Sequence, residues 1–376
     1  MKKLIIDAAG CNKDRNFSYY TYLTDLLNYF YLHREEIKFD KIIVACNEIY
    51  KDCFLQLSDK FEVIGLNCSN HISRYLRQRK YYEIFSLNPE DLVLWPGGYS
   101  ALNKHCHHVL VMHDLLYLRP EFTKSISKAW KWHHKYFFPR SVKIADKVIS
   151  ITQWVKDDMV EKLHVSNPDK IVPIYNYSDF GKYNYASGDR DAINRRGDNG
   201  LEIPKNYFLV VSQDYIHKNV ITAIMAFEKY ASLHPEGKLV LVCKLTNERK
   251  KYIELLPENI KKRILIYRGI SNDDLSKLYR CAEAFIMPTM FEGMGVPLVE
   301  AMYHGARVVS SNIPVAVEVT GGKAIYFNPR NVGELVNILE NIKSYPFPQD
   351  QRTEIEVKFG PKNTCGRYIE VINSFA

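Results

Sequence analysis

Two carboxylates flank a glycine-containing loop in the sequence segment MPTMFEGMGVPLVEAM. Glu292 lies in this loop, and Glu300 lies about one turn into a helix that we expect to begin at Pro297, because proline suits a first helical turn. Gly293 and Gly295 let the backbone approach a ligand, and amides at a helix start favour anions and oxygen acceptors. The segment predicts one concave site bordered by both carboxylates; a solvated loop glutamate and a surface helix charge are the alternative interpretation.

Three further candidate positions follow predicted strands. Lys218 comes after the strand NYFLVVS, where we expect a helix to begin, and a lysine beside helix-terminal amides can hold a diphosphate. His113 and Asp114 follow the strand HVLVM. A neutral histidine can donate or accept a hydrogen bond beside a substrate, although a lone histidine is more often structural. Asp114 would orient this histidine or cap the next turn.

The candidate residues must be positioned by strands and helices, and both halves of the chain show the same alternation of these elements. Short β-branched runs alternate with helical patterns, which is typical of doubly wound parallel sheets. In the first half we expect the strands LIID, KIIVAC, FEVIGL, DLVLW, HVLVMH and KVISIT, with helices at 19–32, 73–86 and 153–163. The second half repeats the alternation with NYFLVVS, KLVLVCK, RILIY, AFIMP, ARVVSS and AIYFN, and with helices near 219–233, 273–280, 297–303 and 332–342.

The pattern divides the chain into two α/β domains. We expect a first domain at 1–178, a linker rich in Gly, Asp, Asn and Arg at 179–204, and a second domain at 205–361. A proline-containing break at 346–361 precedes a last helical stretch, 362–376, which we expect to join the first domain. Open α/β sheets bind ligands beyond the carboxyl ends of their strands, so the candidate residues stand at the expected places.

Composition narrows the class of protein. The chain has 376 residues, 46% of them hydrophobic, and a net charge of +8, which favours two globular domains and an anionic partner over a disordered or fibrous chain. No apolar run approaches the ~18 residues of a membrane-spanning helix. The apolar start MKKLII breaks too early for a signal peptide, and the 8 cysteines form no C-x-x-C pair. These features predict a cytoplasmic protein with reduced thiols.

Glu292 and Glu300 have the spacing of a Glu-x7-Glu signature, and long flanking segments accompany it. These are RILIYRGISNDDLSKLYRCAEAFIMPTMFEGMGVPLVEAMYHGARVVSSNIPVAVEV in the second domain, and VMHDLLYLRPEF and ADKVISITQWVKDDMVEKLHVSNPDKIVPIYN in the first. Together they resemble the family 4 glycosyltransferases, the retaining group with the glycosyltransferase-B fold. The resemblance implies an α/β fold in which two doubly wound, Rossmann-like domains face each other across a cleft.

The resemblance also implies roles for the carboxylates and the loop between them. Glu292 would contact hydroxyl groups of the donor sugar, and the backbone amides of Gly293, Met294 and Gly295 would help to bind sugar or phosphate. Glu300 would hold the hydroxyl groups of the nucleotide ribose, which suits an acceptor with two oxygens.

On the same resemblance, Lys218 would bind the donor diphosphate and stabilise the leaving group, and His113 would face the sugar. Many family members carry an arginine six residues before this lysine, where the present chain has Ser212. Either the diphosphate site has one cation fewer, or His217 or Arg268 supplies it. Arg268 follows the strand RILIY, where the family usually reads the base, and a surface arginine explains it equally well.

Two metal-like motifs and one irregular loop complete the inventory of motifs. HCHH at 105–108 lies on a predicted strand, where adjacent side chains alternate faces and do not converge on one ion. Asp189-Arg-Asp191 resembles a D-x-D metal motif, but it lies in the expected linker and not at a strand end. We therefore expect no metal and no cofactor besides the sugar nucleotide. The loop after the first strand contains only Gly10, where the family often has a glycine-rich loop.

Two stretches interleave basic and aromatic residues, at 74–82 and 124–143. Such surfaces can settle on anionic lipid headgroups, and family members that extend lipid-linked glycans often use their first domain in this way. The alternative is that the aromatic side chains are core and the lysines a solvated helix face. Nucleic acid is not expected as a partner, because no recognised binding motif accompanies the charge.

The sequence and the resemblance together predict a retaining, metal-independent glycosyltransferase with Glu292, His113 and Lys218 as catalytic residues. It would move a sugar from a nucleotide diphosphate sugar to a hydroxyl of a glycan or lipid-linked glycan. Its similarity to bacterial mannosyl- and rhamnosyltransferases of surface polysaccharide favours GDP-mannose and a place on the inner face of the cytoplasmic membrane; uridine and thymidine donors stay open. The alternatives are a sugar-nucleotide epimerase or hydrolase on the same frame, and an inactive nucleotide-sugar- or glycan-binding protein.

Overall fold

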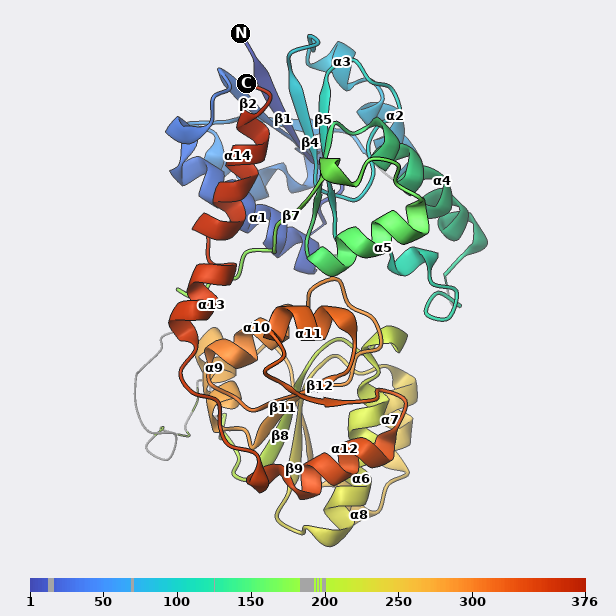
Figure 1. The fold of residues 1–376 in the computed structure, drawn as a ribbon, viewed down its shortest axis with the longest axis vertical. Coiled ribbons are helices and arrows are strands. Elements are labelled where there is room, and N and C mark those ends of the chain that lie inside the picture. Colours follow the sequence, from blue (N-terminus) through green and yellow to red (C-terminus); the bar gives the residue numbers. More distant parts are fainter. Residues whose placement is uncertain are drawn as a thin grey trace. The chain divides into compact units, whose positions relative to one another are not determined.

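The computed structural model of the protein describes residues 1–12, 17–68, 71–124, 126–182, 193, 195, 197 and 201–376. The chain divides into two units, drawn in Figure 1. Unit 1 consists of Met1–Tyr177 together with Phe359–Ala376, and unit 2 consists of Ser178–Lys358. Each unit is built on a parallel sheet, as the alternation of apolar strands and amphipathic helices predicts.

The sheet of unit 1 has the strand order β3-β2-β1-β4-β5-β6-β7, and every pairing in it is parallel. Because helices cover a parallel sheet on both faces, its central strands are apolar without alternation, and Leu4, Ile5 and Ile6 are fully buried. The strands are β1 Lys3–Ala8, β2 Lys41–Asn47, β3 Glu62–Leu66, β4 Leu92–Trp95, β5 His107–Met112, β6 Lys147–Ser150 and β7 Ile171–Pro173.

The helices of unit 1 begin at side-chain caps where the described residues show them. Ser127 Oγ accepts from Trp130 N at the start of α4, and Thr152 Oγ1 accepts from Val155 N at the start of α5. The helices are α1 Phe17–Leu32, α2 His71–Gln78, α3 Tyr81–Ile84, α4 Lys128–Ile144, α5 Gln153–Leu163 and α14 Arg367–Asn373, with a π-helical turn at Lys362–Gly366.

The sheet of unit 2 has the order β10-β9-β8-β11-β12-β13 and is also parallel throughout. Its strands are β8 Tyr207–Val211, β9 Lys238–Val242, β10 Ile264–Tyr267, β11 Ala284–Met287, β12 Val308–Ser311 and β13 Ile325–Phe327. Its helices are α6 Val220–Leu233, α7 Asn247–Glu254, α8 Glu258–Lys261, α9 Asn272–Cys281, α10 Val296–Tyr303, α11 Pro314–Thr320 and α12 Val332–Glu340, followed by α13 Arg352–Phe359. Apolar side chains of β8, β9 and β11 pack against those of α6 and α12 and form a buried core on one face of this sheet.

The described ends of the expected linker pack against unit 2. Phe180 stacks on Tyr303 with ring centroids 4.3 Å apart, and Ile203 is almost fully buried. Arg195 Nη1 donates to the carbonyl oxygen of Pro204 at 2.6 Å. The stretch 179–204 is therefore not a free connection where it is described, because its apolar residues are buried in unit 2. Asp189 and Asp191 lie outside the described residues.

The expected break at 346–361 is wrong, because it contains α13. Ile355 and Phe359 lie four residues apart on this helix and are 2% and 1% exposed, so one face is buried. The prolines at 346, 348 and 361 suggested a loop, but none of them lies inside the helix. The chain re-enters unit 1 at Phe359, three residues before the expected start of the carboxyl-terminal helical stretch.

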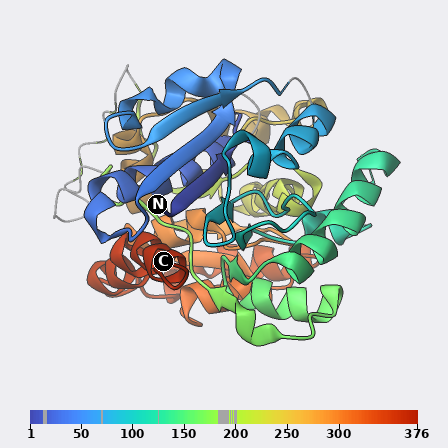
Figure 2. The ribbon, with the colours of Figure 1, turned by 90° about the horizontal axis from the view of Figure 1, so that it is seen from above.

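Both chain ends belong to unit 1. Figures 1 and 2 agree in drawing the amino and carboxyl termini near each other. Asn373 connects α14 to the amino-terminal half of this unit, since its Nδ2 donates to the carbonyl oxygen of Glu36 at 2.7 Å and its Oδ1 accepts from Lys38 N at 2.9 Å. Among the residues that the structure describes, no helix has both the length and the apolar character needed to cross a bilayer.

Candidate functional site

The candidate site of unit 2 lies at the point where its strand order reverses. β8 has β9 on one side and β11 on the other, so the chain leaves β8 and β11 in opposite directions. Loops that diverge in this way open a crevice at the carboxyl ends of the strands, which is where open α/β sheets bind ligands. Lys218 follows β8 and Glu292 follows β11, so the topology brings two of the predicted residues to this edge.

Lys218 and Glu292 form an ion pair between Nζ and Oε2. Their side chains are 23% and 17% exposed, so the pair is accessible to a ligand but partly desolvated. The residues are 74 positions apart, so the contact depends on the pairing of β8 with β11. Because an ammonium group has three donors, Lys218 can hold further oxygen atoms while it stays paired with Glu292.

Lys218 does not stand at the start of a helix, contrary to the prediction. It ends a short 3-10 turn, Ile216–Lys218, and α6 begins two residues later at Val220. Asn219 separates them because its φ of 53° is left-handed, a conformation that asparagine tolerates better than most residues.

Asn219 is a site residue that the sequence analysis missed. Its Nδ2 donates to the carbonyl oxygens of Pro288 and Pro329, both at 2.9 Å, and its Oδ1 accepts from Thr222 Oγ1 at 3.0 Å. One buried side chain thus fastens the loop after β8 to the loop after β11. The position of this asparagine directly before an apolar helix could have marked it as a candidate. Its hydrogen-bond partners could not be predicted, because they lie far away in the sequence.

His217 adds two more connections between the same loops, through its backbone. Its carbonyl oxygen accepts from Met290 N at 2.7 Å and from Thr289 Oγ1 at 2.9 Å. Burial, followed by the charge of Lys218, lowers the pKa of the His217 imidazole to about 3. The ring of His217 is therefore neutral near pH 7 beside Lys218, and its role at a donor diphosphate stays a prediction.

The glycine loop turns into α10 at Gly295. This residue has a φ of 84°, a left-handed conformation in which a side chain would be strained, and a Cβ would lie 3.3 Å from Leu298 Cδ1. Gly293 and Met294 are buried beside it. The loop therefore enters the helix with its backbone close-packed, and α10 starts at Val296, one residue before the expected Pro297.

Glu300 is buried on the first turns of α10, at 7% exposure. Its Oε1 accepts from Lys182 Nζ at 3.2 Å and its Oε2 accepts from Tyr279 OH at 3.1 Å. The side chain is thus not the surface helix charge of the alternative interpretation. Lys182 and Tyr279 were not predicted, because they come from the expected linker and from α9.

A second buried carboxylate supports the loop after β8. Asp214 is 8% exposed, and its Oδ2 accepts from Thr246 N at 2.9 Å and from Thr246 Oγ1 at 2.5 Å. Arg249 Nε donates to Oδ1 at 3.2 Å. This cluster fastens the loop that carries His217 and Lys218 to the start of α7, and nothing in the sequence motif indicated it.

Ser212 and Arg268 lie at the same sheet edge, but they do not join the Lys218–Glu292 pair. Ser212 directly follows β8, and its Oγ donates to the carbonyl oxygen of Gln213 at 3.1 Å. Arg268 directly follows β10, the edge strand, and it is exposed. β9 separates it from β8, so its role toward a base or a diphosphate stays a prediction.

His113 and Asp114 belong to unit 1, at the carboxyl end of β5. His113 Nε2 lies 3.0 Å from the carbonyl oxygen of Pro96. A carbonyl oxygen only accepts, so Nε2 carries the hydrogen and Nδ1 is an acceptor. Burial lowers the pKa of His113 to about 4, which keeps the ring neutral near pH 7. Asp114 Oδ1 accepts from Leu116 N at 2.8 Å and so caps the following turn.

Aromatic rings surround His113 within unit 1. The ring of Tyr22 meets it edge-on with centroids 4.6 Å apart, and the ring of Tyr19 does so at 6.0 Å. Both tyrosines lie on α1. The histidine is therefore held by one backbone hydrogen bond and two ring edges, a fixed orientation for a group that accepts a hydrogen bond.

The basic–aromatic stretch 124–143 has buried aromatic side chains, as the core interpretation expects, and also exposed ones beside cations, as a lipid-binding surface would have. Phe137 and Phe138 of α4 are buried, whereas Trp132 is 63% exposed. Trp132 stacks on Tyr136 with centroids 5.1 Å apart, and the guanidinium carbon of Arg140 lies 3.6 Å from the centroid of Tyr136. One face of α4 is thus core, and the other presents aromatic rings with cations.

The two basic stretches lie together. Tyr75 of α2 meets Phe137 of α4 edge-on with centroids 4.8 Å apart, as the neighbouring helices in Figure 1 suggest. Leu76 of α2 is 53% exposed and Arg77 is also exposed. We call the exposed parts of α2 and α4 the basic–aromatic surface.

The HCHH histidines take separate environments. His105 is exposed and stacks on Tyr82, His107 Nδ1 lies 3.7 Å from Asp146, and His108 is buried. Within the described part of the chain, no group of three or more His, Cys, Asp and Glu side chains has the geometry to hold a metal ion.

Comparisons with known proteins agree with this architecture. Residues 192–356 match the family described as "Glycosyl transferases group 1". The O-antigen chain mannosyltransferase RfbU of Salmonella typhimurium is 26% identical over 324 residues, which are 83% of this chain and 84% of that protein. The serotype-specific mannosyltransferase WbdA of Escherichia coli is 27% identical over 202 residues, 52% of this chain and 24% of that longer protein. The solved structure of sucrose-phosphate synthase from Thermosynechococcus elongatus covers 100% of this chain and 99% of its own, with a TM-score of 0.72 at 14% identity.

The two parallel α/β units have the glycosyltransferase-B fold, and the match of residues 192–356 together with the similarity to RfbU shows that the protein is a glycosyltransferase. The model of the group 1 glycosyl transferases matches residues 192–356, which lie in unit 2 and make up less than half of the chain. The expected fold class and enzyme class are confirmed. A glycosyltransferase of this kind takes a nucleotide-sugar donor and a glycan acceptor. That the two units face each other across a cleft stays a prediction.

Proposed function

We propose that the protein is a retaining, metal-independent mannosyltransferase. It would transfer mannose from GDP-mannose to a hydroxyl of a glycan or lipid-linked glycan during synthesis of bacterial surface polysaccharide. The observation that carries the donor assignment is the similarity to RfbU, an O-antigen chain mannosyltransferase, over 83% of this chain. The similarity to WbdA, also named a mannosyltransferase, supports it over 52%.

Lys218 would stabilise the leaving diphosphate in this reaction. Its ammonium group is partly desolvated beside Glu292, so its attraction to a phosphate oxygen is stronger than that of a surface lysine. Glu292 forms an ion pair with Lys218, and a donor diphosphate would take over part of that contact. The carboxylate would then be available to the hydroxyl groups of the sugar.

Glu300 would bind the ribose through its two oxygens. Both oxygens already accept hydrogen bonds, from Lys182 and Tyr279, so the carboxylate is held in one orientation before a ligand arrives. The backbone of Gly293, Met294 and Gly295, just before α10, would approach the sugar or the phosphate. We propose that Lys218 and these amides take the part that a metal ion plays in other transferases.

His113 would accept a hydrogen bond from a sugar hydroxyl through Nδ1. Its Nε2 is committed to Pro96, and the neutral ring keeps the acceptor at Nδ1 near pH 7. The acceptor hydroxyl would attack from the same face as the departing phosphate, which would take up the proton. His113 thus orients the sugar and does not act as the attacking group.

We further propose that the protein works at the inner face of the cytoplasmic membrane, bound through the basic–aromatic surface. Exposed Trp132 and Leu76 would enter the headgroup region, while Lys128, Lys135 and Arg77 would meet anionic lipid. This arrangement would place the transferase beside lipid-linked acceptors.

The test is a donor comparison with the full-length protein. GDP-mannose, UDP-glucose and dTDP-rhamnose are each incubated with the enzyme and a mannose-containing glycan, and the products are separated by mass and anomeric configuration. We expect mannosyl transfer from GDP-mannose with retained configuration, unaffected by EDTA. Free mannose would instead indicate a hydrolase, and an altered sugar nucleotide would indicate an epimerase. A rise in melting temperature with no product would indicate a binding protein.

A further inference from the structure

Asn219 connects three loops at the carboxyl edge of the sheet of unit 2. It directly follows Lys218 in the loop after β8. Its Nδ2 donates to the carbonyl oxygens of Pro288, which follows β11, and of Pro329, which follows β13, both at 2.9 Å. β11 and β12 lie between β8 and β13 in the sheet. The side chain therefore supplies a connection that strand pairing cannot.

Thr222 sets the orientation of the Asn219 amide. Its Oγ1 donates to Asn219 Oδ1 at 3.0 Å, from the first turn of α6. Because Oδ1 only accepts, this contact turns the amide oxygen toward the helix and the two hydrogens of Nδ2 toward the loops. Asn219 and Thr222 are 8% and 6% exposed, so little water competes for these contacts. Both polar atoms of the Asn219 side chain are thus engaged within the protein.

The residues on either side of Lys218 both bond to the loop after β11. The carbonyl oxygen of His217 accepts from Met290 N at 2.7 Å, and Asn219 donates to Pro288. The carboxylate that pairs with Lys218 belongs to this same loop. Lys218 thus projects from a segment that is fixed, before and after it, to the loop that carries its partner.

We propose that Asn219 is a positioning residue for the transfer reaction, which fixes Lys218 Nζ relative to Glu292 and to the donor diphosphate. The inference rests on the proposed role of Lys218 at that diphosphate. Asn219 acts through Lys218, because its own amide is buried and engaged. A displacement of about 1 Å in a catalytic group can cost about 100-fold in rate, so an amide that binds no substrate can still control the rate.

Asn219→Gly and Asn206→Gly form a matched pair of variants. Glycine keeps the left-handed backbone conformation at either position and removes only the side chain. Asn206 has the same φ of 53°, directly before β8, but it is exposed. The two positions therefore share their backbone conformation and differ in the burial and hydrogen bonds of the side chain.

Lysine acetylation of the full-length protein, without donor, reports the state of Lys218. A limiting dose of acetic anhydride is applied, and peptide mass spectrometry gives the rate at Lys218 relative to exposed Lys343. We expect Asn219→Gly to raise this relative rate about threefold, because the lysine is then less restrained by its ion pair, and Asn206→Gly to leave it unchanged. An unchanged rate in Asn219→Gly would overturn the proposal. The readout uses no donor, so its outcome does not depend on the assignment of GDP-mannose.

Kinetics separates positioning from donor binding. Asn219→Gly should lower kcat about 100-fold and change KM for GDP-mannose less than about threefold, because Lys218 matters most when charge develops on the departing diphosphate. In a Lys218→Ala background the same substitution should change kcat less than about threefold, since the group that it positions is gone. Equal losses in both backgrounds would show that Asn219 acts independently of Lys218, which contradicts a positioning role.

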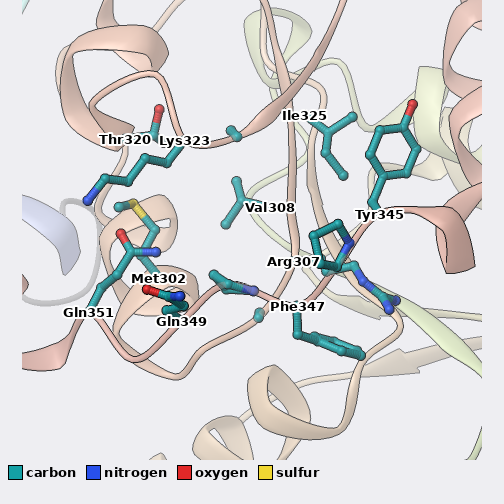
Figure 3. Close-up of a pocket in the computed structure, with 14 residues that line it drawn as sticks. Met302, Arg307, Val308, Thr320, Lys323, Ile325, Tyr345, Phe347, Gln349 and Gln351 are labelled. Atoms are coloured by element: carbon teal, nitrogen blue, oxygen red, sulfur yellow. The ribbon is translucent and has the colours of Figure 1, made fainter.

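Ile325→Ala controls for a general loss of stability in unit 2. Figure 3 shows Ile325 beside a cavity of this unit, at the amino end of β13, whereas Pro329 follows the carboxyl end of the strand. Ile325 packs against the core, so its truncation should destabilise the unit without removing a contact of the Asn219 amide. Urea denaturation compares the stabilities of the variants. If Ile325→Ala lowers kcat and raises Lys218 acetylation as Asn219→Gly does, the effect is one of stability and the proposal fails.

Thr222→Val and Thr222→Ser test the orientation of the amide with Asn219 in place. Serine keeps the hydroxyl and should keep kcat near the wild-type value. Valine removes the donor to Oδ1, so the amide loses its preferred orientation, and we expect kcat to fall about tenfold. These variants decide the matter if Asn219→Gly does not fold. Wild-type kcat in Thr222→Val, or equal losses in both variants, would refute the role of the amide.

Discussion

The hydroxyl groups of Tyr22 and Tyr368 lie 3.1 Å apart, although 346 positions separate the residues in the chain. Tyr22 belongs to α1 and Tyr368 to α14, so this hydrogen bond connects the carboxyl-terminal helix to the amino-terminal sheet unit. Burial raises the pKa of both phenols, which stay protonated and can donate to each other. The ring of Tyr22 also contacts His113. The hydrogen bond to Tyr368 therefore helps to position a side chain that packs against a candidate catalytic residue.

Tyr368→Phe should therefore destabilise the protein. It leaves the hydroxyl of Tyr22 without its partner in a desolvated place, which costs about 1–3 kcal/mol of unfolding free energy. Urea denaturation measures the loss. The double variant Tyr22→Phe/Tyr368→Phe should be more stable than Tyr368→Phe alone, because no orphaned hydroxyl remains. A strictly additive double-mutant cycle would show that the two hydroxyls do not interact.

Glu292→Ala should abolish transfer and leave the fold intact. The substitution removes the partner of Lys218 and the proposed contact to the sugar, and loss of one preorganised electrostatic group costs about 100-fold or more in kcat. Product formation from the preferred donor measures the effect, and circular dichroism reports the fold. Glu340→Ala, at an exposed glutamate that ends α12, is the control. Unchanged turnover in Glu292→Ala would refute the site assignment.

Glu300→Gln should act on donor binding more than on chemistry. The amide keeps an oxygen that accepts from Tyr279, but it loses the charge that faces Lys182 and one acceptor for the ribose. We expect KM for the donor to rise about tenfold with a smaller change in kcat, because ribose contacts are made equally in the ground and transition states. A fall in kcat at constant KM would place Glu300 in the chemical step instead.

Stability should fall as the pH falls from 6.5 to 4, in part through His108. Burial lowers the pKa of this histidine from 6.5 to about 4, so the unfolded chain binds its proton first as the solution is acidified. The stabilisation present above pH 6.5 is lost progressively toward pH 4, and the loss is on the order of 3 kcal/mol. Urea denaturation at several pH values measures it. His108→Phe should flatten the profile in this range, whereas His105→Phe, at an exposed position, should not.

Replacing Lys128, Lys131 and Lys135 with glutamate should weaken binding to anionic vesicles. All three lie on α4, within the basic–aromatic surface, and the attraction of each cation to an anionic bilayer is about 1 kcal/mol. Co-sedimentation with phosphatidylserine vesicles measures the change. The control reverses three exposed lysines of unit 2, Lys205, Lys244 and Lys250. Equal binding by the wild type and the α4 variant would remove the membrane proposal.

The sequence predicted the parts of the site whose signals are local. Glu292, Gly295 and Glu300 stand where a strand, a glycine turn and a proline-started helix follow one another, and each signal lies within a few residues of the next. The strands could also be predicted from the sequence, because buried parallel strands are continuous apolar runs.

Contacts that depend on the order of the strands in the sheet could not be predicted from local sequence signals. Lys182 and Tyr279 reach Glu300 from 118 and 21 residues away, and Asn219 reaches Pro329 across 110. The neutral state of His217 follows from burial, which no motif records. α13 was missed because its buried face is short, and nearby prolines gave a stronger local signal.

Unit 1 is assembled from both ends of the chain, and unit 2 is an uninterrupted stretch between them. During synthesis, residues 178–358 are available as a whole before residues 359–376 have left the ribosome. Domains generally fold as units, beginning from the amino terminus, but here the amino-terminal unit has to wait for α14. The first sheet to be translated is thus the last unit to be completed, and a stop codon shortly before Tyr368 would leave the second unit whole while depriving the first of its final helix.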